Sequence, residues 1–250
     1  MIVVSDVILS DSIPYLEELL HDADPSEDMH MILDSPGGDG ETAVRMVRSA
    51  QARCRELTVI VPDQAKSAAT ILAMGAHWIL MGPTSDLGPV DPQLPIGSGN
   101  QRTLVSAKDI IAAVTAAELA VAKKPSTFPV HVSLLSGLSA LQVQQARSAL
   151  DRTGDLVAEA LRSHPQRTER EVRNLKRKLQ KPLLDLPKDH GAIFGATDAQ
   201  KAGLPVNIAD PDSDQWKMVW RLYAKYLALG RVRVYEGYRA SQIIDIPAPI

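Results

Sequence analysis

One serine, Ser67, stands where an apolar segment meets a small-residue helix, in the stretch VPDQAKSAATILAMGA (residues 61–76). Serine is a favoured helix N-cap because its hydroxyl accepts a backbone N–H of the first turn. A serine at a strand-to-helix bend is also suited to be a nucleophile, since the next backbone N–H then points to the place where an oxyanion forms. The residue types around Ser67 are compatible with both roles.

Two adjacent glycines, Gly37 and Gly38, occur in DSPGGDG (residues 34–40). Glycine adopts positive φ readily and lets backbone N–H groups approach a ligand closely. Pro-Gly-Gly also forms ordinary turns, and the absence of both GxGxxG and GxxxxGK argues against a phosphate-binding loop. Beside Ser67, however, this loop can supply a second oxyanion donor, so the two motifs together favour nucleophilic chemistry at a carbonyl.

The elements that must position these motifs alternate between strands and helices. Periodicity predicts strands at residues 29–35, 56–62 and 78–83, with helices at 40–53 and 66–76 between them. Such an order predicts a parallel sheet with right-handed crossovers, and sheets of this kind bind ligands beyond the carboxyl ends of their strands. The glycine motif follows the first strand and the Ser67 motif follows the second, so both fall at that edge of the sheet.

The second half of the chain is mainly helical by its periodicity. Helices are predicted at residues 106–124, 139–164, 168–181, within 195–206 and at 214–229. The last helix carries one apolar face, which is typical of packing against the domain or a partner subunit and consists of Trp216, Val219, Trp220, Tyr223 and Leu227. We expect residues 1–207 to form the core and residues 208–250 to form a C-terminal helical extension.

Composition argues against several classes of function. A net charge of −3 and a pI of about 6.1 give no broad attraction to nucleic acids or acidic membranes. The single cysteine, Cys54, cannot form an internal disulfide, and no Cys/His cluster has metal-ligand spacing, so we expect neither a metal nor an organic cofactor. The longest apolar run, residues 68–81, is too short to span a bilayer, and the N-terminus lacks the pattern of a signal peptide. We therefore expect a cytoplasmic protein.

Several of these motifs together resemble a known family. ILDSPGGDGETAVRM (residues 32–46) and VIVPDQAKSAATILAMGAHWILMGPTSDLGPVDPQL (residues 59–94) are similar to the ClpP-class serine peptidases, and specifically to the serine dehydrogenase proteinase family related to signal-peptide peptidase SppA. The order is the same: glycine loop, KSA serine, GA helix end, strand, and LGPVDPQ loop. The later segment DHGAIFGATDAQKAGLPV (residues 189–206) is similar to the closing element of the family core.

The resemblance implies a fold, an activity and an assembly. The expected fold is an α/β ClpP/crotonase-like spiral of βαβ units with a mostly parallel sheet, followed by a helical second half. The expected activity is hydrolysis of peptide bonds in peptide or protein substrates through an acyl-enzyme. Members of the family frequently form homo-oligomers, so we expect this chain to do the same.

The resemblance also assigns roles to particular residues. Ser67 matches the nucleophile, and Ala68 the residue whose N–H completes the oxyanion hole. Gly37 and Gly38 match the oxyanion loop. Residues 87–93, which include Gly88 and Asp91, match the loop that shapes the substrate groove, although Asp91 also has a structural interpretation.

The general base is the part of the site on which this chain departs from ClpP. ClpP uses a histidine in the loop after the third strand, and residues 84–100, which we expect to form that loop, contain none. Lys66 is a poor base because successive helical side chains diverge by about 100°. His77 follows Ser67 by ten residues, which along a helix corresponds to about 15 Å.

Two residues remain as candidates for the base. Lys108 follows the loop, SppA-like enzymes use a lysine downstream of the serine, and burial can lower the pKa of such an amine. His190 lies where ClpP relatives place the acidic member of their triad, but the expected His-Asp order is reversed in Asp189 and His190. We rank Lys108 first, His190 second, and an inactive or differently built site third.

Two other classes of protein are kept as alternatives. The missing ClpP histidine and the aromatic C-terminal helix also suit a catalytically inactive scaffold or oligomeric adaptor. A crotonase-type acyl-CoA enzyme shares the expected fold, but it would bind coenzyme A thioesters and would not need Ser67.

Overall fold

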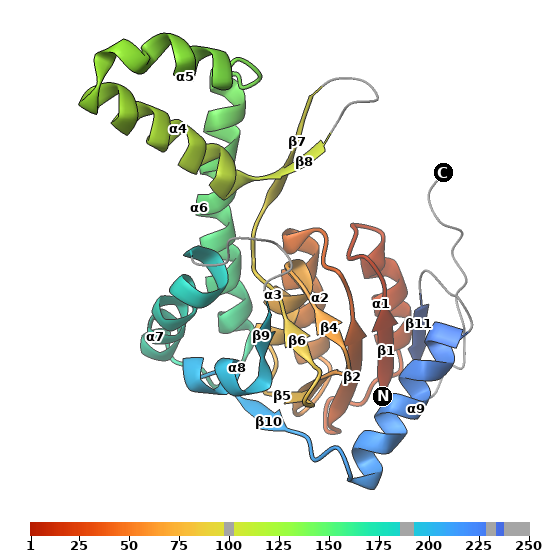
Figure 1. The fold of residues 1–250 in the computed structure, drawn as a ribbon. Helices are drawn as coiled ribbons and strands as arrows, with labels where there is room; N and C mark the ends of the chain where they lie inside the picture. The colour runs from red at the N-terminus through yellow and green to blue at the C-terminus, as the bar shows by residue number, and fades with distance from the viewer. Residues whose placement is uncertain (98–102, 186–192, 229–233, 238–250) are drawn as a thin grey trace. The chain divides into compact units, whose positions relative to one another are not determined.

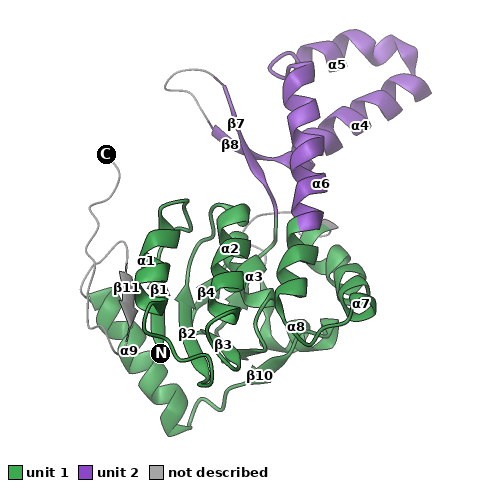
Figure 2. Cartoon of the chain, turned by 180° about the vertical axis from the view of Figure 1, so that it is seen from behind, with its two compact units in different colours: residues 1–90, 156–250 green, residues 91–155 purple. Residues whose placement is uncertain are grey.

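The computed structural model describes residues 1–97, 103–185, 193–228 and 234–237 (Figure 1). It divides into two compact units, the first made of residues 1–90 and 156–250 and the second of residues 91–155 (Figure 2). The sequence predicts a different division, into a core of residues 1–207 and a C-terminal extension of residues 208–250. That division remains a prediction.

A sheet forms the centre of the first unit, with the strand order β10-β5-β3-β2-β1-β11 among the described residues. The strands are β1 (Ile2–Ser5), β2 (Met29–Asp34), β3 (Leu57–Val61), β5 (Trp78–Met81), β10 (Val206–Ile208) and β11 (Val234–Gly237). Five of these strands run parallel, and β11 pairs antiparallel with β1. The predicted α/β class with a mostly parallel sheet is confirmed, and it is consistent with a ClpP-like fold.

Helices cover both faces of this sheet, so its strands are apolar on both sides. On β2, Met31 and Leu33 pack into the larger core, whereas Ile32 packs on the opposite face. The helices before β5 are α1 (Ser12–Leu20), α2 (Gly40–Gln51) and α3 (Ala68–Met74). They contribute to the larger core, and every residue of α3 is buried.

The later helices of the first unit follow recognisable end signals. They are the end of α6 (Ala140–Ser163), α7 (Glu169–Leu179), the π-helical segment η3 (Gln180–Asp185) and α8 (Ala196–Ala202). Thr168 and Glu171 form a capping box at the start of α7. Gly203 ends α8 in the left-handed conformation, at φ 97°.

A second sheet of short strands lies beyond the ends of the main strands and was not predicted. It consists of β4 (Gln64–Ala65), β6 (Asp86–Leu87) and β9 (Phe194–Gly195), in the order β4-β6-β9. Strands of two residues show no periodicity that a sequence could reveal. Part of the predicted loop of residues 84–100 therefore has regular structure.

The second unit combines a hairpin with helices. It contains β7 (Gln93–Ile96), β8 (Thr103–Ser106), α4 (Ala107–Lys123), the 3₁₀ turn η2 (Pro125–Thr127), α5 (Phe128–Leu134) and the first part of α6. The two strands pair antiparallel, and its small core is centred on Ala107, Ile110 and Ala146. Throughout the part of the chain that the structure describes, no helix is both long and apolar enough to cross a membrane.

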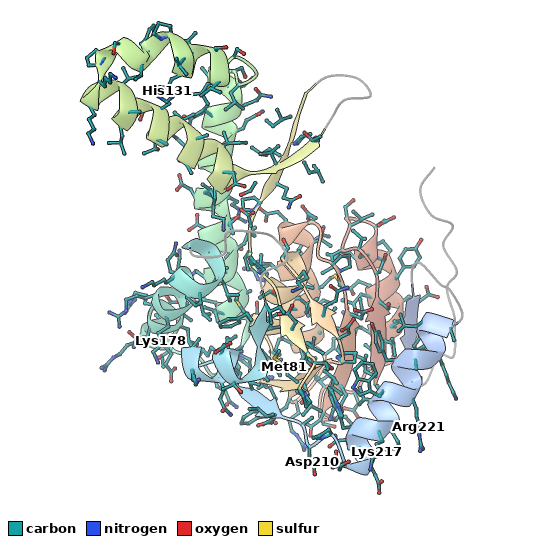
Figure 3. The ribbon with its side chains drawn as sticks, viewed as in Figure 1. Met81, His131, Lys178, Asp210, Lys217 and Arg221 are labelled. Atoms are coloured by element: carbon teal, nitrogen blue, oxygen red, sulfur yellow. The ribbon has the colours of Figure 1, made fainter. Side chains whose placement is uncertain are left out.

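The helix α9 (Asp214–Ala228) packs on the face of the sheet opposite the larger core. Trp216 is 3% exposed, and a Cβ atom on Gly82 would lie 2.2 Å from its Cζ2 atom. Lys217 and Arg221 project from the exposed side of the helix (Figure 3). The amphipathic packing expected of this helix is therefore present.

One residue of the expected apolar face differs. Leu227 is 59% exposed, whereas Tyr226 is buried with Trp216, Val219 and Tyr223. The spacing 216, 219, 223 and 226 follows the helical repeat of 3.6 residues, which leaves position 227 outside the buried stripe.

We expect Trp216→Ala to lower the free energy of unfolding by about 3 kcal/mol, because it removes a large buried ring and leaves a cavity. Leu227→Ala, at the exposed position of the same helix, should change it by less than about 0.5 kcal/mol. Urea unfolding of both variants measures the difference. Equal effects of the two substitutions would contradict the packing of α9 described above.

Candidate active site

Ser67 occupies the N-cap position of α3 but does not act as a cap. Its side chain makes no capping hydrogen bond, and its backbone has φ 48° and ψ −113°. Within the described residues, it is the one residue other than glycine with a positive φ. This conformation is strained for a residue with a Cβ atom, and such strain tends to occur at functional sites.

The glycine loop after β2 depends on its two glycines. Gly37 has φ 105° and Gly38 has φ 136°. The loop runs beside Ile8, whose N–H donates to Gly37 O (2.7 Å) and whose carbonyl accepts from Asp39 N (2.7 Å). A Cβ atom on Gly38 would lie 2.1 Å from the Ile8 carbonyl oxygen, so no larger residue fits there without a backbone shift.

This loop lies directly against Ser67. A Cβ atom on Gly37 would be 2.8 Å from Ser67 Cβ and 3.2 Å from the backbone nitrogen of Ala68. The structure therefore brings together the loop of Gly37 and Gly38 with the bend of Ser67 and Ala68. These four residues are those that the sequence places around the reacting carbonyl.

A buried serine, Ser35, joins the two segments. Its hydroxyl oxygen accepts the Gly37 N–H (3.1 Å), its N–H donates to Gln64 O (3.0 Å), and its carbonyl accepts from Lys66 N (2.9 Å). The sequence analysis missed this residue. Its place immediately before Pro-Gly-Gly is the signal that could have indicated it.

Two backbone N–H groups at the site have no acceptor among the described residues: those of Gly38 and Ala68. The bridge to Ile8 uses Gly37 O and Asp39 N, which leaves Gly38 N unused. Ala68 opens α3, and the first N–H groups of a helix have no acceptor within it. Both groups can therefore donate to a ligand.

Thr70, a buried hydroxyl of α3, connects this helix to the short strands. Its Oγ1 donates to Ala65 O (2.6 Å) and accepts from Gly88 N (3.1 Å). Gly88 N also donates to Ala65 O (3.0 Å). The predicted groove residue Gly88 is thus held beside the segment that leads to Ser67, through a threonine that the sequence analysis also missed.

Lys66 has an acidic partner of its own. Its Nζ forms an ion pair with Asp86, whose other carboxylate oxygen accepts from Phe194 N (2.7 Å). Asp86 was not singled out from the sequence. This pairing agrees with the sequence argument against Lys66 as the base.

The remaining predicted residues lie elsewhere in the chain. Lys108 and Asp91 belong to the second unit, where Ser106 Oγ donates to Asp91 Oδ1 (2.9 Å) and accepts from Lys108 N (3.1 Å). Asp91 thereby supports the beginning of α4, on which Lys108 lies. His190 lies outside the described residues. His77 is 4% exposed, and its Nδ1 accepts from Leu57 N (2.9 Å), so it has a structural partner.

The other end of α3 is capped by Arg167. Its guanidinium donates to Met74 O (2.6 Å), Leu161 O (3.2 Å) and Ala76 O (3.3 Å), and burial lowers its pKa to about 10. A cation here satisfies carbonyl groups that the helix itself leaves without donors.

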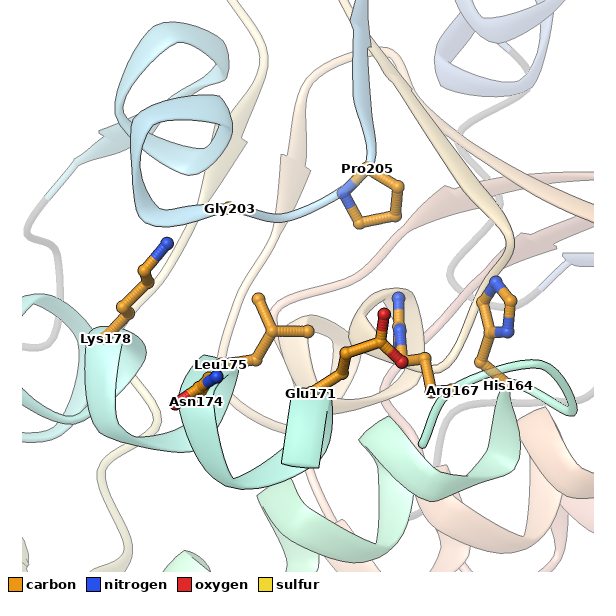
Figure 4. A pocket seen from close by; sticks show the side chains of 8 residues that line it. All are labelled: His164, Arg167, Glu171, Asn174, Leu175, Lys178, Gly203 and Pro205. Carbon is orange, nitrogen blue, oxygen red and sulfur yellow. The ribbon is translucent and has the colours of Figure 1, made fainter. Parts of the chain in front are cut away.

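Arg167 also lines a pocket of about 370 Å³ between α7 and the turn after α8 (Figure 4). The lining consists of His164, Arg167, Glu171, Asn174, Leu175, Lys178, Gly203 and Pro205. The Glu171 carboxylate accepts from Thr168 N and Thr168 Oγ1, both at 2.8 Å. Arg167 and Glu171 are thus already bonded within the chain.

His164, in the same pocket, has a pKa lowered to about 4, mainly by burial and further by Arg167 and His77. The rings of His164 and His77 lie 4.4 Å apart between centroids, and burial also lowers the pKa of His77. Both histidines are therefore neutral at pH 7. Within the described residues, no group of His, Cys, Asp and Glu side chains has the arrangement of a metal site.

We expect the free energy of unfolding to fall as the pH decreases from about 6.5 to about 4. In that range an unfolded His164, with its ordinary pKa of 6.5, binds a proton that the folded chain excludes. Urea unfolding across this range should show a shallower decline for His164→Gln, whereas the exposed-site control His21→Gln should keep the wild-type slope. An unchanged slope in His164→Gln would contradict this account.

Two similarities to known proteins bear on this site. Residues 11–117 match the model of the ClpP-like SDH-type serine proteinase family. Over 64 residues the chain is 41% identical to an uncharacterised protein of Methanocaldococcus jannaschii, a match that covers 26% of this chain and 22% of that protein. The chain thus matches about a fifth of the length of this relative. The family resemblance drawn from the sequence is confirmed by the first match.

Proposed function

We propose, from the match of residues 11–117 to the ClpP-like SDH-type serine proteinase family, that this chain is a serine peptidase with Ser67 as its nucleophile. The observation that carries the proposal is the strained bend of Ser67 against the glycine loop. A nucleophile needs an exposed hydroxyl next to oxyanion donors, and this bend sets the Ser67 hydroxyl at the helix start without using it as a cap.

In the proposed reaction, Ser67 Oγ attacks the carbonyl carbon of the scissile peptide bond and transfers its proton to the base. The carbonyl oxygen becomes an oxyanion, which accepts from the N–H groups of Gly38 and Ala68. The base then returns the proton to the leaving amine, and the C–N bond breaks to give an acyl-enzyme. Water attacks the ester carbonyl, and its proton passes through the base to Ser67 Oγ as the acid product leaves.

We propose Lys108 as the base. It lies within residues 11–117, whereas His190 lies outside the matched segment. It also lies in the first turn of α4, which Asp91 and Ser106 hold at its N-terminus. A neutral lysine amine can accept the serine proton.

The substrates we propose are peptides or unfolded segments of proteins, since the reaction requires an accessible peptide bond. Homo-oligomeric assembly and a cytoplasmic location remain predictions from the sequence. No step of the proposed reaction needs a metal or a cofactor.

We expect Ser67→Ala to reduce peptide hydrolysis by at least about 10³-fold, because no other group in the proposed site can form the acyl-enzyme. A labelled fluorophosphonate should modify the wild type at Ser67 and should not modify Ser67→Ala. Ser26→Ala, at an exposed loop serine, is the control and should match the wild type. Unchanged hydrolysis in Ser67→Ala would contradict Ser67 as the nucleophile, whereas absent hydrolysis and absent labelling of the wild type would favour the inactive scaffold or the acyl-CoA enzyme.

Separate substitutions of Lys108 and His190 identify the base. We expect Lys108→Ala to reduce hydrolysis nearly as much as Ser67→Ala, since residues that act as a unit are not additive. His190→Ala should retain most of the activity, and so should Lys123→Ala at the far end of α4. Loss of activity in His190→Ala with retention in Lys108→Ala would transfer the role to the histidine.

A further inference from the structure

A tyrosine of α9, Tyr223, reaches the strand ends from which the proposed site is built. It is 5% exposed, and its hydroxyl donates to Asp63 Oδ2 (3.1 Å). The Asp34 carboxyl lies nearby, and the same hydroxyl lowers the pKa of that carboxyl in part. One phenol from the C-terminal part of the chain therefore binds one carboxyl group and lies beside a second.

These two carboxyl groups belong to neighbouring parallel strands. Asp34 is the last residue of β2, and its Oδ2 accepts from Ser5 Oγ at 3.4 Å. Asp63 follows β3, and its carbonyl accepts from Asp86 N (2.8 Å). Asp34 Oδ1 is buried and has no hydrogen-bond partner among the described residues.

Burial and like charge both act on the ionisable groups of this cluster. Burial, and after it the charge of Asp63, raises the pKa of Asp34. Burial and the same two carboxyl groups raise the pKa of Tyr223, so its hydroxyl remains a donor at neutral pH. Two like charges at adjacent strand ends repel each other, and a hydroxyl that donates to one of them beside the other offsets part of that repulsion.

The positions of the two acids connect this cluster to the site. Asp34 immediately precedes Ser35, whose hydroxyl holds Gly37, and Asp63 precedes Gln64, whose carbonyl accepts from Ser35 N. A change in the spacing of Asp34 and Asp63 is therefore a change in the spacing of the glycine loop and the Ser67 segment. Errors of about 1 Å in such an arrangement can reduce catalysis by about 100-fold.

We propose that Tyr223 is a positioning residue: its hydroxyl holds the ends of β2 and β3 at the spacing that sets the glycine loop against Ser67. The proposal rests on the function proposed above for its catalytic consequence, and on the hydrogen bonds of the cluster for its structural part. Tyr223 touches neither the substrate nor Ser67 in this role.

The test compares Tyr223→Phe with Tyr226→Phe. Each removes one hydroxyl from a buried tyrosine of the same helix, but Tyr226, 7% exposed, packs in the apolar cluster and has no hydrogen-bond partner among the described residues. Amide hydrogen exchange is measured over residues 35–39 and 64–68, and fluorophosphonate labelling at Ser67.

We expect Tyr223→Phe to exchange about tenfold faster in both segments and to label about tenfold more slowly, with kcat reduced and KM within about twofold of the wild type. Tyr226→Phe should match the wild type in every measurement. Equal exchange in the two variants would overturn the proposal. If the wild type is neither labelled nor active, the proposed function fails, while the exchange comparison still decides the role of Tyr223.

A second variant tests the mechanism by which Tyr223 acts, and it keeps the proposal testable if Tyr223→Phe folds poorly. Adding Asp34→Asn to Tyr223→Phe removes one of the two facing charges, so exchange in both segments should return toward the wild-type rate. A double variant that exchanges as fast as Tyr223→Phe alone would show that the carboxyl pair does not transmit the effect, which would also overturn the proposal.

Discussion

The candidate site depends on a contact in which two pieces of backbone approach with no side chain between them. The loop at Gly37 lies so close to the Ser67 segment that one added carbon atom would collide with Lys66 O and Ser67 Cβ. Ser35 maintains this approach by bonding to both segments. Because the contact is made of backbone and one buried hydroxyl, its geometry is set by the sheet rather than by flexible side chains.

The surrounding fold fixes α3 at both of its ends. At the start, Thr70 ties the helix to Ala65 and Gly88, and at the end Arg167 satisfies the free carbonyls. Every residue of α3 is buried, so the helix has little room to move. A helix of seven residues is only marginally stable by itself, so the stability of α3 comes from its tertiary contacts.

The sequence predicted the parts of this arrangement that have a period or a motif. The three central strands and the helices between them were predicted within a few residues, because the strands are apolar on both faces and α2 is amphipathic. The two-residue strands, the ion pair of Lys66 with Asp86 and the role of Ser35 were missed, since each depends on segments that only tertiary structure brings together. The exposure of Leu227 was not predicted, because an apolar face of α9 that ends in Leu227 and one that ends in Tyr226 share most of their residues.

The positive φ of Ser67 has an evolutionary consequence. A residue with a Cβ atom in that conformation costs of order 1–3 kcal/mol relative to an unstrained one, and glycine would largely avoid this cost. Selection for folding alone would therefore favour glycine at position 67. In the proposed peptidase, a serine there gives up stability in exchange for a hydroxyl group, and drift after loss of that activity would begin with this residue.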